Sequence, residues 1–93
     1  MGADRAVIVK ITGRVQGVWF RGWTRREATR LGLNGWVRNE TDGSVSACIS
    51  GPPAKVAEMA QLFHHGPPGA RVDQVETSTA EPGGLRGFDV LRR

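Results

Sequence analysis

A short glycine-containing loop near the start of the chain is the first candidate for chemistry. It joins a segment of alternating apolar residues to one of helical spacing, and it consists of Gly13, Arg14, Val15, Gln16, Gly17 and Val18. In such a strand-to-helix loop several backbone N–H groups can point toward one place, and the start of the helix adds its own unpaired N–H groups. The loop is therefore a candidate anion site, although two glycines there are more often plain turn residues. The Gly-Lys-Ser/Thr ending of a nucleotide-binding P-loop is absent.

Arg21 strengthens the anion interpretation. It falls in the first turn of the predicted helix, where a cation opposes the helix dipole at a cost of roughly 0.3 to 1 kcal/mol. A bound anion explains this placement, because a guanidinium can grip it with paired hydrogen bonds. The alternative is an exposed arginine on a basic helix, which is how we interpret Arg25, Arg26 and Arg30.

Asn39 is the third candidate. It ends a predicted strand just before a turn, where asparagine is common for purely local reasons. In the fold predicted below, the end of this strand need not be far from the loop after the first strand. An amide there could hold a water beside a bound phosphate.

Other reactive or aromatic residues carry less weight. His64 and His65 close the second predicted helix, where the dipole favours histidine, so we interpret them as structural. Trp19 and Trp23 lie one helical turn apart and could cover the mouth of the loop, but packing is the preferred interpretation. Cys48 has no histidine in a plausible relation to it, and we expect no thiol chemistry.

Alternation of period two and helical spacing predict the elements that must position these residues. Strands are expected at residues 5–12, 36–39, 44–50 and 70–78, with a short closing strand at 88–90. One helix is expected over about 19–31. A second begins at the Gly-Pro-Pro of residues 51–53 and includes Phe63.

Local signals refine these elements. Gly32 is well placed as the left-handed residue that ends the first helix, and the Asp-Gly pair within 40–43 predicts a hairpin turn. The odd spacing of Val72 and Val75 fits a strand only if that strand carries a bulge. In the third strand, apolar residues alternate with a second set on a face expected to be wet or free of helices, namely Ser44, Ser46, Cys48 and Ser50.

The order βαββαβ, with a short extra C-terminal strand, predicts an α+β fold. It is the split βαβ pattern of ferredoxin-like sandwiches, an antiparallel sheet with two helices packed on one face. The length of 93 residues predicts a single domain, residues 1–93, because two cores could not be built from so short a chain. A monomer is the expected state. The fold hosts many functions, so function must come from the site.

Composition excludes several classes of protein. Hydrophobic residues at 39% and charged residues at 24% argue against disorder and fibrous repeats. The single cysteine excludes an internal disulfide framework, and no Cys-x-x-Cys or Cys/His cluster offers a metal site. The apolar stretch at residues 6–9 is too short for a signal peptide or a membrane span. We therefore expect a cytoplasmic protein with no membrane partner.

The charge of the chain favours an anionic partner. The net charge is +4, and eleven of the thirteen cationic residues are arginine. A guanidinium suits phosphate and carboxylate groups, whether on a small molecule or on a nucleic-acid backbone. From charge alone both classes stay open.

Two segments resemble the signatures of the acylphosphatase family. The first is Gly-Arg-Val-Gln-Gly-Val-Trp-Phe-Arg at residues 13–21. The second is Gly-Trp-Val-Arg-Asn at 35–39, followed by Asp-Gly-Ser-Val at 42–45. Two signatures in the right order and spacing are far more specific than one. The similarity is dense from about residue 11 to 52 and thins beyond, but it continues as far as residues 87–90.

The resemblance implies an enzyme with a ferredoxin-like fold that hydrolyses acyl phosphates to a carboxylate and inorganic phosphate. It implies that the backbone of the loop from Arg14 to Val18 cradles the phosphate, that Arg21 binds its oxygens and that Asn39 orients the attacking water. No cofactor and no metal are expected. The partner is a small-molecule acyl phosphate, or a phosphate- or sulfate-like anion.

Two departures from the family pattern and two competing functions complete the prediction. The chain has no tyrosine, so Arg92 and Arg93 stand where some animal members end in one, and Gly22 is a poor helix former directly after Arg21. A nucleic-acid-binding module is the first alternative. The basic-Gly-Phe start at residues 86–88 does not continue into the aromatic signature of an RNA-binding strand, so no nucleic acid is expected. A phosphate-binding module without turnover is the second alternative.

Overall fold

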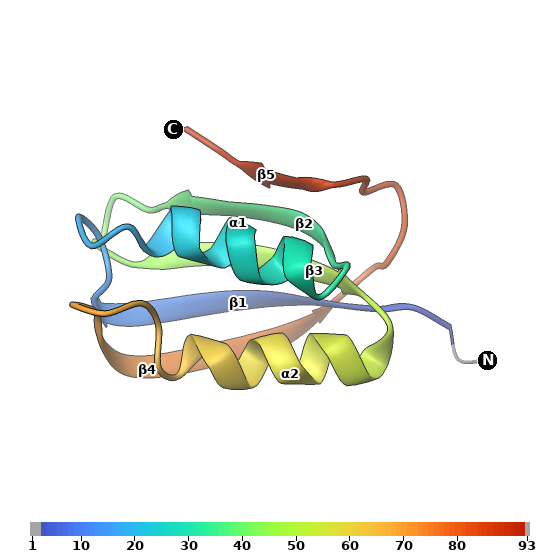
Figure 1. Ribbon diagram of the computed structural model, residues 1–93, viewed down its shortest axis with the longest axis horizontal. Helices are drawn as coiled ribbons and strands as arrows, with labels where there is room; N and C mark the ends of the chain where they lie inside the picture. Colours follow the sequence, from blue (N-terminus) through green and yellow to red (C-terminus); the bar gives the residue numbers. More distant parts are fainter. Residues whose placement is uncertain (1–2, 93) are drawn as a thin grey trace.

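Seven elements follow one another in the computed structural model, which describes residues 3–92 (Figure 1). They are β1 (Arg5–Arg14), α1 (Phe20–Arg30), β2 (Asn34–Asn39), β3 (Val45–Gly51), α2 (Pro53–Phe63), β4 (Arg71–Ala80) and β5 (Phe88–Val90). The predicted order of strands and helices is confirmed. Residues 1, 2 and 93 of the predicted domain lie outside the described residues.

The strands form one sheet in the order β4-β1-β3-β2-β5, and both helices lie side by side over one of its faces (Figure 1). The four long strands pair antiparallel, which confirms the ferredoxin-like α+β fold. The short β5 differs, because it pairs parallel with β2 and makes the sheet mixed. It does so because the chain after β4 crosses from one edge of the sheet to the other and enters beside β2 in the same direction.

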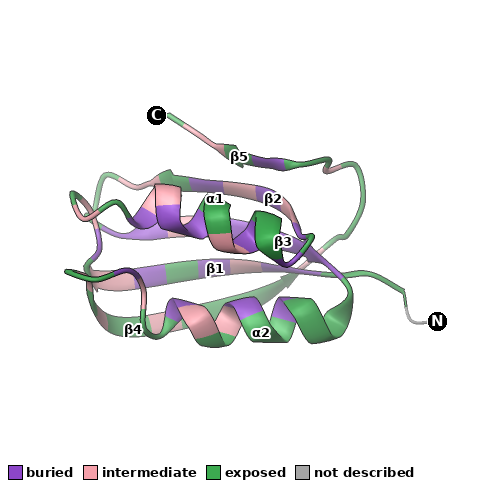
Figure 2. Ribbon diagram, in the orientation of Figure 1, coloured by how far each residue is buried: buried purple, intermediate pink, exposed green. Residues whose placement is uncertain are grey.

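The core lies between the helices and the sheet, and Figure 2 shows buried stretches of ribbon in both helices and in the central strands. Three aromatic rings join the two helices. Phe20 and Trp23 of α1 meet edge to face with centroids 5.3 Å apart, and Phe63 of α2 stacks on Phe20 at 6.2 Å. These contacts fix the first turn of α1 against the rest of the molecule.

The end of α1 follows the predicted glycine signal. Gly32 has a φ of 73°, and its N–H donates to the carbonyl of Thr29 while the N–H of Leu33 donates to that of Ala28. This pair of hydrogen bonds is a Schellman motif. Leu33 is buried beyond it, so the chain turns directly into β2.

The predicted bulge is present in β4 and lengthens β1. Consecutive β1 residues at the bulge pair with Gln74 and Val72, which leaves Asp73 as the extra residue. Gly13 is at this point, with a φ of 126°, and a Cβ there would overlap the carbonyl oxygen of Arg71. The strand predicted to end at residue 12 therefore continues for two residues, and Gly13 serves the close approach of β4.

The helix-free face of β3 is only partly wet. Cys48 and Ser50 on this face are buried, 5% and 4% exposed. The neighbouring strands place Ile8 and Trp36 opposite Cys48, and these larger side chains cover the small one. Burial raises the pKa of the Cys48 thiol.

Candidate active site

A pocket of about 330 Å³ opens where the β1–α1 loop meets the end of β2 and the C-terminal segment. It is lined by Val15, Gly17, Trp19, Phe20, Arg21, Gly22, Asn39, Val90 and Arg92. A second hollow shares three of these residues and adds Gln16 and Glu40. In Figure 1 the loop, the start of α1 and the C-terminus lie at the same end of the molecule. The fold thus brings Arg21 and Asn39, 18 positions apart in the chain, to one pocket.

The backbone of the loop is free to bind an anion. Gly17 and Trp19 adopt left-handed conformations, with φ of 77° and 65°, and Trp19 caps α1 without a side-chain hydrogen bond. Within residues 3–92, the backbone N–H groups of residues 15–22 donate no hydrogen bond to a turn, a loop or a side chain. The first turn of α1 also contains no acidic residue. Unpaired N–H groups and the positive end of the helix dipole therefore meet at the pocket.

Arg21 is oriented by the C-terminal segment. Its guanidinium donates to the carbonyl oxygen of Leu91 at 3.3 Å, which leaves most of its donors for the pocket. Arg92 lines both hollows beside it. Its position in the site could not be predicted from spacing, because β5 reaches β2 only through parallel pairing at the sheet edge.

Gln16 ties the loop to the β2–β3 turn. Its side-chain amide donates to the carbonyl of Glu40 at 2.8 Å and to that of Ser44 at 2.9 Å. Asn39 directly precedes this turn, so the loop and the Asn39 backbone are held in one fixed relation. The family resemblance implies only a backbone role for Gln16, and it gives no sign of these side-chain hydrogen bonds.

The turn itself is stabilised by charge. The Asp42 carboxylate accepts hydrogen bonds from the hydroxyl and the N–H of Ser44, at 2.5 and 2.9 Å, and pairs with Lys10 at 3.0 Å. The bonds from Ser44, followed by that from Lys10, hold the pKa of Asp42 well below its usual range. Asp42 therefore stays ionised near neutral pH and is a turn residue rather than a candidate acid.

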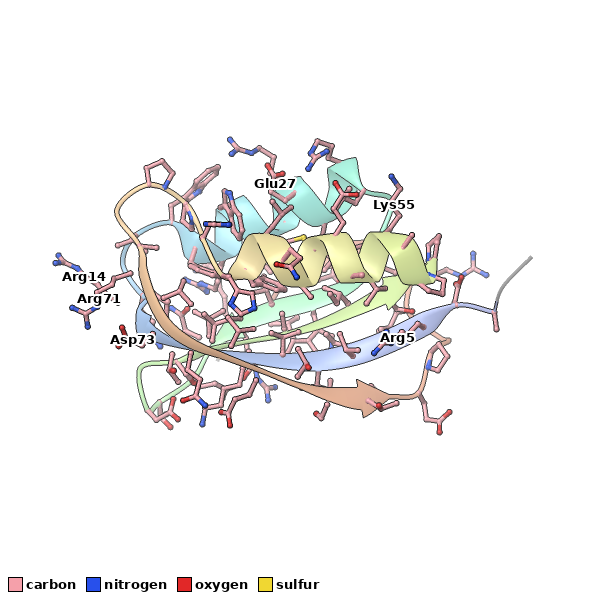
Figure 3. All side chains as sticks on the ribbon, turned by 90° about the horizontal axis from the view of Figure 1, so that it is seen from below. Arg5, Arg14, Glu27, Lys55, Arg71 and Asp73 are labelled. Carbon is pink, nitrogen blue, oxygen red and sulfur yellow. The ribbon has the colours of Figure 1, made fainter. Side chains whose placement is uncertain are left out.

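The remaining loop residues have separate places. Arg14 is exposed at the end of β1 beside Arg71 and lies outside the residues that line the pocket (Figure 3). Val15 is buried, and Val18 packs against the core. Their side chains anchor the loop, so any contact with an anion falls to the backbone.

Trp19, which precedes α1, and Trp23 within α1 differ in burial. Trp23 is buried, 7% exposed, as predicted from packing. The same prediction is wrong for Trp19, which is 60% exposed and lines the pocket. The left-handed backbone at Trp19 directs its side chain out of the helical pattern from which packing was predicted.

The described residues offer neither a cluster of metal ligands nor a membrane-spanning helix. No group of three or more His, Cys, Asp or Glu among residues 3–92 could hold a metal ion. Neither described helix is long and apolar enough to cross a membrane.

Comparison with known proteins decides the family. The acylphosphatase family model matches residues 7–90. The chain belongs to the acylphosphatase family. The predicted resemblance is thereby confirmed, and so is the prediction that the chain is an enzyme.

Individual members of the acylphosphatase family are similar along nearly the whole chain. A protein of Rhizobium meliloti (strain 1021) named acylphosphatase is 62% identical over 86 residues, covering 88% of this chain and 90% of its own. The solved acylphosphatase of Coxiella burnetii has a TM-score of 0.91 at 31% identity, covering 95% and 93%. That of Bacillus subtilis has a TM-score of 0.91 at 28% identity, covering 94% and 98%.

Proposed function

We propose that this enzyme hydrolyses acyl phosphates to a carboxylate and inorganic phosphate. In this proposal the backbone N–H groups of the β1–α1 loop and Arg21 bind the phosphate, and Asn39 positions the attacking water. The observation that carries the proposal is the convergence of Arg21 and Asn39 on a pocket rimmed by unpaired N–H groups. Family membership supports the same reaction class.

The chemistry needs positioning more than acid–base catalysis. Water attacks phosphorus, the bond from phosphorus to the acyl oxygen breaks, and the carboxylate leaves with the electron pair. A carboxylate is a good leaving group, so no general acid is required. The proton of the water passes to a phosphate oxygen. The loop and Arg21 stabilise the negative charge on the transferring group, and Asn39 holds the water in line with the breaking bond.

The proposal also explains the unfavourable placement of Arg21. A cation in the first turn of a helix costs roughly 0.3 to 1 kcal/mol in isolation. Here the guanidinium donates a hydrogen bond to the Leu91 carbonyl. When substrate binds, it also donates to the phosphate oxygens. Arg92 at the same rim adds to the attraction for the anion.

The enzyme is expected to act without a cofactor or metal, as a cytoplasmic monomer in which the single domain of residues 1–93 carries the site. The ligand is a small acyl phosphate or a related anion, and no nucleic-acid partner is expected. Arg21 and Asn39 are the catalytic residues of this proposal. The phosphate-binding residues are Arg14, Val15, Gln16, Gly17 and Val18.

Hydrolysis of benzoyl phosphate in the presence of a chelator tests the proposal. Arg21→Ala should lower kcat/KM at least about 100-fold and weaken inhibition by inorganic phosphate, because it removes a donor to the phosphate. Asn39→Ala should lower kcat by about 100-fold or more while phosphate inhibition stays within twofold. Arg30→Ala is the matched control. Arg30 is exposed and lies outside the residues that line the pocket, and its guanidinium donates hydrogen bonds to Glu27, so the rate of this variant should stay within twofold of wild type.

Three outcomes would contradict the proposal. Turnover that survives Asn39→Ala would remove the water-positioning role, and turnover lost with the chelator would remove the metal-free mechanism. Folded wild-type enzyme that binds phosphate without turnover would favour the binding module instead. Circular dichroism of each variant separates loss of function from loss of fold.

A further inference from the structure

Trp19 is the only large hydrophobic side chain that is exposed among residues 3–92. It has 60% of its surface exposed, and its φ of 65° is rare for a bulky residue. Its indole lines the phosphate pocket and also a neighbouring hollow with Gly22, Arg25, Arg26, Thr29 and Val90. Such a backbone conformation persists only when the surrounding structure stabilises it. It places an aromatic side chain at the wall of the pocket that contains Arg21 and Asn39.

Gly22 provides the space that the indole occupies. A Cβ at Gly22 would overlap Nε1 and Cε2 of Trp19, so no larger residue is compatible with this position of the ring. Glycine weakens a helix interior relative to alanine. The space that the indole needs explains why this poor helix former stands at position 22. Arg26, one turn further along, holds its guanidinium 5.1 Å from the ring centroid.

The phosphate pocket and the hollow beside Arg25 and Arg26 share one boundary. Trp19, Gly22 and Val90 line both, so the indole and Val90 stand where the phosphate pocket continues outward. In an acyl phosphate the carbonyl carbon lies one oxygen away from phosphorus. With the phosphate in the loop, the acyl group must extend outward along a wall of the pocket. Trp19 and Val90 form such a wall.

We infer that Trp19, seated on Gly22, forms with Val90 the binding site for the acyl group and makes the enzyme prefer acyl phosphates with flat apolar, above all aromatic, acyl groups. This inference rests on the proposed function. Stacking and burial against an indole favour a ring over a methyl group. The residues named here determine specificity, whereas Arg21 and Asn39 serve every acyl phosphate alike.

The test compares kcat/KM for benzoyl phosphate and acetyl phosphate. Trp19→Ala should lower the ratio of the benzoyl phosphate value to the acetyl phosphate value about 5- to 10-fold. Inhibition by inorganic phosphate should stay within twofold, because the loop backbone and Arg21 are unchanged. Trp19→Phe keeps a ring and should restore most of the preference.

Gly22→Ala tests the position of the Trp19 indole in a second way. Its new methyl group displaces the indole, so the preference for benzoyl phosphate should fall as it does in Trp19→Ala. If the indole had no fixed seat, this substitution would instead raise thermal stability through helix propensity and leave the substrate ratio unchanged.

The outcomes separate this inference from the proposed function. An equal loss on both substrates in Trp19→Ala, or no loss on either, would overturn the acyl-site inference while leaving hydrolysis established. Failure of folded wild-type enzyme to hydrolyse either substrate would overturn the proposed function and the inference with it. Should Gly22→Ala fail to fold, the comparison of Trp19→Ala with Trp19→Phe still decides, because that side chain is exposed.

Discussion

Replacing Gln16 by methionine tests whether the loop must be tied to the β2–β3 turn. Methionine is of similar length and has no donor, so the hydrogen bonds from Gln16 to the carbonyls of Glu40 and Ser44 are both lost. Neither carbonyl becomes an orphan. That of Glu40 also accepts from Gly43 at 3.2 Å, and that of Ser44 also accepts from Glu40 at 2.9 Å.

The magnitude follows from these contacts. A hydrogen bond contributes about 0.5–1.5 kcal/mol net, and the two carbonyls keep a second donor, so the loss in unfolding free energy should be about 1–2 kcal/mol. For a domain of this size that corresponds to a fall in Tm of about 4–16 °C. Activity should fall further than stability predicts. A loosened loop misplaces its N–H groups relative to Asn39, and a shift of about 1 Å can cost about 100-fold in rate.

The assay combines urea unfolding with kcat/KM for benzoyl phosphate and inhibition by inorganic phosphate. Gln61→Met is the matched control, because Gln61 is exposed on α2 and glutamine and methionine have similar helix propensity. The control should change unfolding free energy by less than about 0.5 kcal/mol and leave the rate unchanged. Wild-type kcat/KM in a Gln16→Met variant that has lost the expected stability would refute the idea that this tie positions the loop for catalysis.

Three further predictions concern stability, and urea unfolding measures each. Thr24→Val should raise unfolding free energy by about 1 kcal/mol, because within the described residues the buried Thr24 hydroxyl has no hydrogen-bond partner; a decrease would contradict this. Asp42→Asn should destabilise at pH 7. The low folded pKa of Asp42 gives stability that is present above its ordinary value near 4 and lost as pH falls, so the difference from wild type should shrink from about pH 5 downward, and a constant difference would be evidence against it. Gly35→Ala should cost at least about 2 kcal/mol, because φ is 143° and a Cβ would overlap the Cys48 carbonyl oxygen. In the control Gly43→Ala nothing lies within 4 Å, so only the strain of its φ of 93° remains and the loss should be smaller; equal losses would point away from the overlap.

The fold could be predicted from the sequence because its signals are local. Gly32 ends α1 through hydrogen bonds that reach back only three to five residues, and the Asp42–Gly43 pair forms the turn of the β2–β3 hairpin. The spacing of Val72 and Val75 also predicted the bulge in β4. The parallel pairing of β5 was not, since it depends on where the preceding loop carries the chain.

The site divided along the same line. The loop, Arg21 and Asn39 were candidates from residue type and position, and two family signatures joined them into one hypothesis. The contacts that organise the site were not visible. Gln16 reaches carbonyls 24 and 28 positions away, and Arg21 reaches one 70 positions away.

By itself, then, the sequence determined the order of the elements, the ferredoxin-like sandwich and the residues that an anion would need. Periodicity, caps and turn pairs report on neighbours within a few residues, and these suffice for that much. Only the tertiary structure decided that Trp19 stands exposed over Gly22, that Arg14 points away, and that the C-terminal segment holds Arg21. The direction of Arg14 and the contact of Arg21 with Leu91 depend on strands that pair only when the sheet forms, and the exposure of Trp19 depends on a left-handed backbone that its spacing does not indicate.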